Sequence, residues 1–200
     1  PSIPKIFGIN KPAEAVDNSL LPHITESGVK IMSMNMLLPN ATDPVLWRGP
    51  VISGVVKQFW EDVQWGDVDF LFVDMPPGTG DVPLTVFQSL PINGILIVST
   101  PQSLVSMIVD KAMNMAQMMQ VPVLGMVENM RFLRCPDCGK EIPLFGSDDH
   151  VDNHAVPVLE RIPLDPTVAA ACDAGKLEQA EIDYLAKTAV MLTETFGKKQ

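Results

Sequence analysis

The sequence predicts an α/β protein whose mostly parallel sheet carries helices on both faces. Three short, almost wholly apolar runs, at 70–74, 94–100 and 121–127, have the length and composition of buried parallel strands. Helical spacing occurs before and between these runs: apolar residues recur on one face over 50–60, ahead of the first run. A Met-rich helix is predicted between the second and third runs, from Ser103, as its cap, to about Gln120. Strands that alternate with helices along one chain favour a parallel sheet.

The remaining segments extend this pattern. Residues 29–38 alternate loosely between apolar and polar side chains and end at Pro39, which predicts another strand. A strand over 156–162 and a helix from Leu177 to about Phe196 complete the expected fold. Because 200 residues with 46% hydrophobic content can close one core, we expect a single domain over 1–200, with an insertion at about 131–146.

Composition argues against two classes of partner. Lys and Arg total 14 against 24 Asp and Glu, so the net charge of −10 offers no basic surface for nucleic acid or an anionic membrane. No apolar run reaches the roughly 18 residues of a membrane span, and the first four residues lack a signal-peptide pattern. With three cysteines, too few for a disulfide scaffold, we expect a cytoplasmic protein.

Polar side chains follow each of the three apolar runs. Asp74, Thr100 and Asn129 stand at the predicted strand ends, and ligands of open parallel sheets bind beyond the carboxyl ends of the strands. An Asp in this position either holds Mg²⁺ beside a phosphate or simply starts a turn. Gly78, just after Asp74, can present a backbone N–H to a terminal phosphate. No Gly-Lys-Ser/Thr phosphate loop occurs in the sequence, so these residues form half of a phosphate site.

A second chemical centre is the pair Cys135 and Cys138. Two thiolates two residues apart can share one metal, and Pro136 and Gly139 favour a tight turn that points both sulfurs the same way. Two sulfurs do not complete a tetrahedral or cubane site, whereas a symmetric dimer brings four. The pattern leaves open an iron–sulfur cluster, a zinc shared across a dimer and a redox disulfide.

Taken together and in order, several motifs resemble the Mrp-type, or ApbC-like, P-loop ATPases, which are relatives of MinD and of the nitrogenase iron protein. The resemblance covers nearly the whole chain. Its motifs are Pro1-Ser2-Ile3-Pro4-Lys5, Trp47-Arg48-Gly49-Pro50, Asp74-Met75-Pro76-Pro77-Gly78-Thr79-Gly80-Asp81, Thr100-Pro101-Gln102, Val121-Pro122-Val123-Leu124-Gly125, Glu128-Asn129-Met130, the two cysteines, and Ile162-Pro163-Leu164-Asp165-Pro166.

The resemblance implies roles for individual residues. Asp74 takes the Walker B position and acts as a catalytic residue, and the loop with Pro77 and Gly78 responds to the γ-phosphate. Asn129 contacts adenine, and the loop that holds Pro163 and Asp165 lines the base pocket.

The resemblance also implies the cofactors and the partners. Cys135 and Cys138 bind a labile 4Fe–4S cluster between two subunits, ATP and Mg²⁺ bind the intact protein, and the clients are apo iron–sulfur proteins. Relatives carry their phosphate loop upstream of the position of Pro1, so we expect an N-terminally truncated chain that is inactive as an ATPase by itself.

Two other functions remain open at this point. A MinD- or ParA-like positioning ATPase would carry a basic or amphipathic C-terminal helix, but residues 177–196 are acidic and the cysteine pair has no use there. A non-catalytic interaction domain stabilised by zinc would explain the missing phosphate loop. The favoured function is an iron–sulfur cluster carrier and assembly ATPase.

Overall fold

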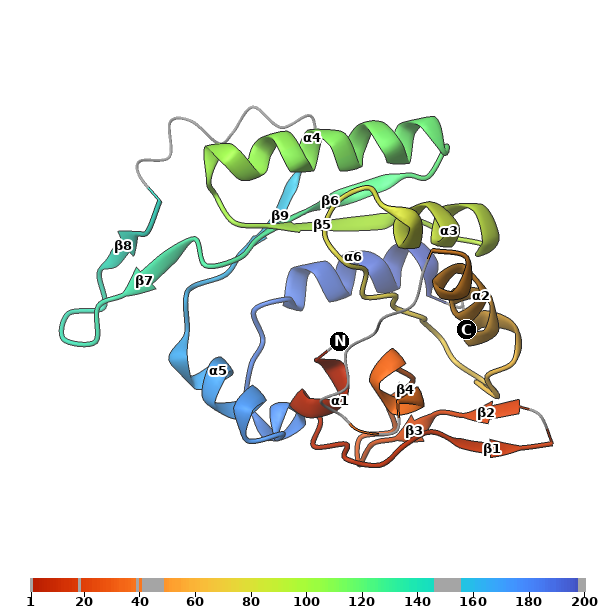
Figure 1. The fold of residues 1–200 in the computed structure, drawn as a ribbon. Coiled ribbons are helices and arrows are strands. Elements are labelled where there is room, and N and C mark those ends of the chain that lie inside the picture. Colours follow the sequence, from red (N-terminus) through yellow and green to blue (C-terminus); the bar gives the residue numbers. More distant parts are fainter. Residues whose placement is uncertain (1, 18, 39, 41–48, 146–155, 198–200) are drawn as a thin grey trace. The chain divides into compact units, whose positions relative to one another are not determined.

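The computed structural model forms two compact units, each built from two separate parts of the chain. It describes residues 2–17, 19–38, 40, 49–145 and 156–197. Pro1–Asp74 and Pro166–Ile182 form the first unit, and Met75–Asp165 and Asp183–Gln200 form the second (Figure 1). The described helices include none that is long and apolar enough to cross a membrane.

The first unit combines short helices with two small antiparallel hairpins. Strand β1 pairs with β2 and β3 with β4, while Ile9, Ile31 and Met36 form a buried cluster. Helix α1 packs against α5. Its elements are α1 (Ile3–Ile6), β1 (Glu14–Val16), β2 (Ser19–Leu21), β3 (His23–Ile24), β4 (Lys30–Ile31), the 3₁₀ helix η1 (Met34–Leu37), α2 (Gly49–Glu61), α5 (Pro166–Asp173) and the 3₁₀ helix η3 (Leu177–Gln179).

Two sequence predictions for this unit have different outcomes. The helix expected over 50–60 is confirmed as α2, because Val55 lies on its buried face. The strand expected over 29–38 is wrong beyond Ile31. The chain turns at Ser33 into η1, and the Met36 carbonyl accepts a hydrogen bond from the Ala13 N–H at 2.8 Å. This turn places the Met36 side chain in the core, which an extended segment would not do.

The predicted buried strand over 70–74 is not formed. Residues 70–74 belong to no strand, and the side chain of Phe72 is 71% exposed. A strand needs a hydrogen-bonded neighbour, and within the described ranges this run pairs with none. The rings of Phe70 and Phe72 stack with their centroids 6.3 Å apart, so the apolar side chains contact one another in place of a core.

The second unit holds the parallel sheet that the sequence predicts. Its strand order is β5, β6, β9, and both pairings are parallel, which confirms the α/β fold class. Helix α4 packs against β5 and α6 against β9, on opposite faces of the sheet (Figure 1). The elements are α3 (Asp81–Ser89), β5 (Ile95–Ser99), α4 (Ser103–Met118), β6 (Val123–Glu128), β7 (Phe132–Arg134), β8 (Glu141–Pro143), β9 (Val158–Arg161) and α6 (Ala186–Phe196).

The core of this unit lies between α4 and the sheet. Ile97, Val109 and Met126 are buried there, with Val158 from β9 packed against them. The predicted strands at 94–100, 121–127 and 156–162 correspond to β5, β6 and β9, and the predicted Met-rich helix corresponds to α4. The N-cap position of α4 is Gln102, which makes no side-chain capping bond, so the prediction that Ser103 occupies this position is wrong.

The last predicted helix is shorter than expected. Leu177–Gln179 form a 3₁₀ turn, and α6 begins only at Ala186. The Glu160 carboxylate from β9 accepts the backbone N–H groups of Lys187 and Thr188 at 2.8 and 3.2 Å. Unpaired N–H groups at a helix start need such an acceptor. This long-range cap fixes where the helix begins, and no local pattern encodes it.

Candidate functional site

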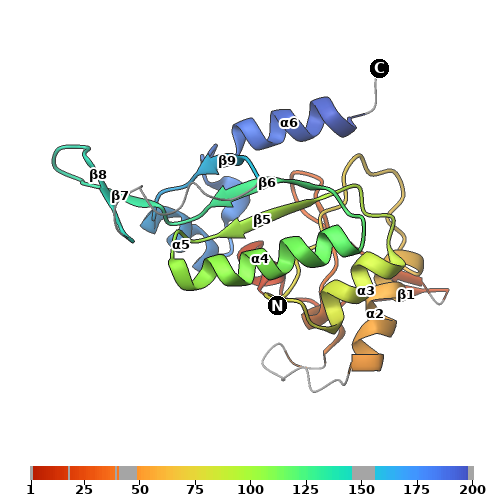
Figure 2. The ribbon, with the colours of Figure 1, turned by 90° about the horizontal axis from the view of Figure 1, so that it is seen from above.

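The cysteine pair lies on the turn of the β7–β8 hairpin. Arg134 pairs with Glu141 at the end of the ladder, and the residues between them close the turn. The Cys135 N–H donates to the Lys140 carbonyl and the Gly139 N–H to the Cys135 carbonyl, both at 2.9 Å. Gly139 has a φ of +71°, which a side chain disfavours. The hairpin extends away from the three-stranded sheet in both views (Figure 1 and Figure 2).

The two thiols have different surroundings. Cys135 is half-buried, Cys138 is exposed, and neither forms a disulfide. The backbone N–H groups of Cys138 and Asp137, together with the Cys138 side chain, hold the pKa of Cys135 below its ordinary value. Hydrogen bonds to a thiolate stabilise the deprotonated form that binds metal. The turn therefore presents two adjacent sulfur ligands, and the lowered pKa of Cys135 lets this thiol lose its proton more readily than an ordinary one.

Among the residues that the structure describes, one chain supplies too few ligands for a complete site. Among the described residues there is no group of three or more His, Cys, Asp or Glu side chains that could hold a metal. The third cysteine, Cys172, lies on α5 in the first unit. Because zinc and cubane clusters take four protein ligands, the sulfurs of Cys135 and Cys138 fit half of either site.

The carboxyl ends of β5 and β6 lie side by side. The Asn129 N–H donates to the Ser99 carbonyl at 2.7 Å, which brings Asn129 next to the end of β5 and Thr100. The Asn129 side-chain oxygen accepts the backbone N–H of Met130 at 3.0 Å, and Met130 adopts a φ of +53°. The structure thus brings together two of the three predicted strand-end residues.

The predicted base-pocket loop continues from the neighbouring strand β9. Backbone bonds of 2.8 and 2.9 Å join Ile162 to Glu128 and Arg131, so the loop runs beside the Asn129 segment. Pro163 is buried and Asp165 is half-buried. Asn129, Pro163 and Asp165 therefore lie on two adjoining segments of one unit.

Tyr184 is a contact of this loop that no sequence pattern indicates. Its hydroxyl donates to Asp165 Oδ2 at 2.7 Å, and this hydrogen bond to the carboxylate raises the pKa of Tyr184. Tyr184 stands 19 positions after Asp165, so no spacing rule connects the two residues.

A buried carboxylate also escaped sequence-based prediction. Glu128 ends β6, is 1% exposed, and contacts Arg161 Nε at 3.0 Å and Arg131 Nε at 3.6 Å through its Oε2 atom. Its other oxygen, Oε1, is buried and has no hydrogen-bond partner among the described residues. The acidic residue after an apolar strand was a visible signal, but the sequence does not show that its side chain turns inward.

Residues predicted to contact phosphate and Mg²⁺ are divided between the units. Asp74 is exposed and belongs to the first unit, while Pro77 and Gly78 are exposed at the start of the second. Gly78 has a φ of +88°, and no described residue lies within 4 Å of the position that a Cβ would take there. Gly80 precedes α3. Among the described residues, the side of Gly78 that a Cβ would occupy is therefore open.

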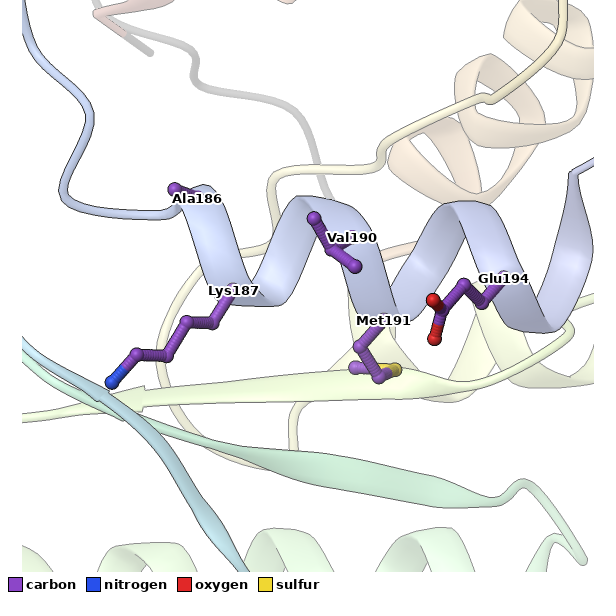
Figure 3. Close-up of a pocket in the computed structure, with 5 residues that line it drawn as sticks. All are labelled: Ala186, Lys187, Val190, Met191 and Glu194. Carbon is purple, nitrogen blue, oxygen red and sulfur yellow. The ribbon is translucent and has the colours of Figure 1, made fainter.

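An open pocket of about 410 Å³ lies along α6 and is separate from these residues. Figure 3 shows Lys187 and Met191 extending to the side of the helix where the sheet strands run. The pocket contains none of the predicted site residues. Its lining residues are Ala186, Lys187, Val190, Met191 and Glu194.

Comparisons with known proteins identify relatives along almost the whole chain. An iron–sulfur cluster carrier protein from Clostridium perfringens is 42% identical over 190 residues, which are 90% of this chain and 66% of the relative. One of the same name from Methanocaldococcus jannaschii is 42% identical over 180 residues, which are 88% and 62% of the two chains. The chain thus spans slightly less than two thirds of the length of these curated relatives.

A solved structure has the same fold. It is a nucleotide-binding protein from Archaeoglobus fulgidus in complex with ADP and with Co, and it is 38% identical with a TM-score of 0.78. The match covers 92% of this chain and 73% of the other. A family model described as "ParA: NUBPL iron-transfer P-loop NTPase" matches residues 1–195. With a match of this extent, the chain belongs to the iron-transfer P-loop NTPases of the ParA family.

Proposed function

We propose that this protein carries an iron–sulfur cluster and delivers it to apo-proteins in the cytoplasm. The observation that carries the proposal is the exposed turn on which Cys135 and Cys138 present two sulfurs. The names of the relatives, iron–sulfur cluster carrier proteins, support this function. Because one turn supplies two ligands, we propose that a second copy of the chain supplies two more and that a 4Fe–4S cluster bridges the copies.

Delivery of the cluster is a ligand exchange. Each bond from iron to a carrier sulfur breaks as a bond from iron to a client thiolate forms, and the proton that leaves the client thiol ends on the released cysteine. Iron and sulfide keep their oxidation states, so no oxidant or reductant is needed. Exposed Cys138 is open to an incoming client, while the backbone N–H groups around Cys135 stabilise its thiolate.

A nucleotide site completes the proposal. We assign adenine contacts to Asn129, Pro163 and Asp165, and phosphate contacts to the loop of Pro77 and Gly78. The side-by-side ends of β5 and β6 and the ADP complex of the solved relative support this assignment. Mg²⁺ at Asp74 would neutralise phosphate charge.

Anaerobic reconstitution with iron and sulfide tests the cluster assignment. We expect the wild-type chain to become brown and to transfer its iron to an apo-ferredoxin, while Cys135→Ser and Cys138→Ser lose both properties. Cys172→Ser is the matched control, because its thiol lies on α5 in the first unit, and it should load normally. Stoichiometric zinc without iron uptake, or loading that depends on Cys172, would overturn the proposal.

A further inference from the structure

The cysteine hairpin is attached to the sheet through a short segment at its base. Among the described residues, two backbone bonds tie this base to the end of β9 and the loop after it: Arg131 N–H to the Ile162 carbonyl and Leu164 N–H to the Phe132 carbonyl. A third bond, from Leu144 N–H to the Arg131 carbonyl, joins the two arms of the hairpin. The lengths of the three bonds are 2.9, 2.8 and 3.3 Å. Since β7 and β8 pair only with each other in the described sheets, the orientation of the turn depends on this base.

A buried ion cluster lies at the same base. Arg131 is the last residue before β7. Its side chain is buried beside the equally buried side chain of Glu128. Arg161, on β9, contacts the same oxygen and is about half exposed. The carboxylate therefore joins the end of β6, the strand β9 and the start of the hairpin.

Stability alone is a poor explanation for this arrangement. The cost of removing charges from water roughly offsets the attraction within a buried ion pair, and an apolar replacement is often equally stable. Here the cost is larger, because Glu128 Oε1 is also buried without a partner among the described residues. The Arg161 Nε hydrogen bond fixes the Glu128 carboxylate, and the ion pair at 3.6 Å then holds the buried Arg131 side chain beside it.

We propose that Glu128 is a positioning residue that holds Arg131, and with it the base of the β7–β8 hairpin, so that the cysteine pair keeps the orientation needed to bind a cluster. The inference rests on the proposed function for its role in cluster transfer. Glu128 also directly precedes Asn129, so the carboxylate lies beside the proposed nucleotide segment.

Glu128→Gln tests the proposal, because the amide keeps the size of the side chain and loses its charge. In the apo chain we expect backbone N–H exchange at Arg131 and Leu164 to become about tenfold faster, and alkylation of half-buried Cys135 to accelerate. In the reconstituted chain we expect faster cluster loss to an apo-ferredoxin. Arg131→Met, which removes the buried cation, should give the same pattern if Glu128→Gln does not fold.

Glu160→Gln is the matched control. It makes the same chemical change one strand away, where the carboxylate caps α6, and should lower stability without altering the hairpin. Two results would overturn the positioning role. One is that the two variants, compared at equal free energy of unfolding, lose the cluster equally fast. The other is that backbone N–H exchange in Glu128→Gln becomes faster evenly over the whole second unit. If the wild-type chain binds no iron, the proposed function fails, but the exchange and alkylation measurements still decide this inference.

Discussion

At the scale of single residues, the chemistry of the chain depends on how each polar side chain is paired. Cys135 and Cys138 are separated by two residues, yet the turn directs the backbone N–H groups of Asp137 and Cys138 to the Cys135 sulfur. Cys138 is the more exposed sulfur. We infer that Cys135 competes for metal against protons better than an ordinary thiol, because the hydrogen bonds that lower its pKa favour the thiolate.

Cys135 should therefore remain reactive toward an alkylating reagent at lower pH than an ordinary thiol does. Its pKa is lowered, so more thiolate is present at neutral pH and reactivity falls only as the pH drops through the lowered value. Quenched alkylation across pH, read by mass spectrometry of the apo chain, measures this profile. A Cys138→Ser variant should keep most of the shift, since the largest cause is a backbone N–H. A midpoint at or above the ordinary thiol value would contradict the expectation.

The surroundings of a residue could be predicted from the sequence where they depend on a short, local motif. The cysteine turn follows from Cys-Pro-Asp-Cys-Gly, because a local turn needs only local residues. The partners of Glu128 and of Asp165 were not predictable, because Arg161 and Tyr184 reach them from distant parts of the chain. Whether the predicted residues bind nucleotide or a cluster remains a prediction.

At the scale of elements, an apolar run forms a strand only where a neighbouring strand is present to pair with it. The apolar runs at β5 and β6 became strands because each lies beside a partner with which it forms a parallel ladder. The equally apolar run at 70–74 did not, since within the described residues no strand pairs with it. The start of α6 likewise depends on Glu160, a residue on another strand. Sequence pattern predicts the tendency to form an element, whereas tertiary contacts decide whether and where it forms.

The packing of β6 against β9 requires a residue without a side chain at Gly125. A Cβ at Gly125 in β6 would lie 2.5 Å from the Leu159 Cγ of β9, which is closer than packed carbon atoms approach one another. We expect Gly125→Ala to lower the free energy of unfolding by about 1–3 kcal/mol, because Leu159 must move in a packed interface. Denaturant unfolding followed by circular dichroism measures the change.

Gly54→Ala provides the contrast for that measurement. Gly54 lies inside α2, and outside the helix's own backbone no described residue lies within 4 Å of its added Cβ. Because alanine is the better helix former, this substitution should raise stability by about 0.5–1 kcal/mol. A Gly125→Ala variant as stable as Gly54→Ala would show that β6 and β9 are not packed as closely as the structure indicates.

At the scale of the whole molecule, ligand number and net charge act in opposite directions on assembly. Two cysteines per turn favour a pair of chains around one cluster, because four sulfurs complete the site. The net charge of −10 on each chain opposes close approach of two copies. In the proposed dimer the cluster supplies attraction against this repulsion, so we expect the dimer fraction to depend on salt.

Sedimentation of the reconstituted chain tests this balance directly. We expect cluster-loaded protein to sediment as a dimer with about four irons per two chains, and the Cys135→Ser variant to remain monomeric. Raising the ionic strength from about 0.01 M to about 0.15 M shortens the screening length from about 30 to about 8 Å, so the dimer fraction should increase. Monomers that carry about four irons each would contradict the shared site, because the described residues of one chain offer two sulfurs on the turn. A dimer fraction that falls as salt is added would show that attraction between charged surfaces, and not the bridging cluster, holds the two copies together.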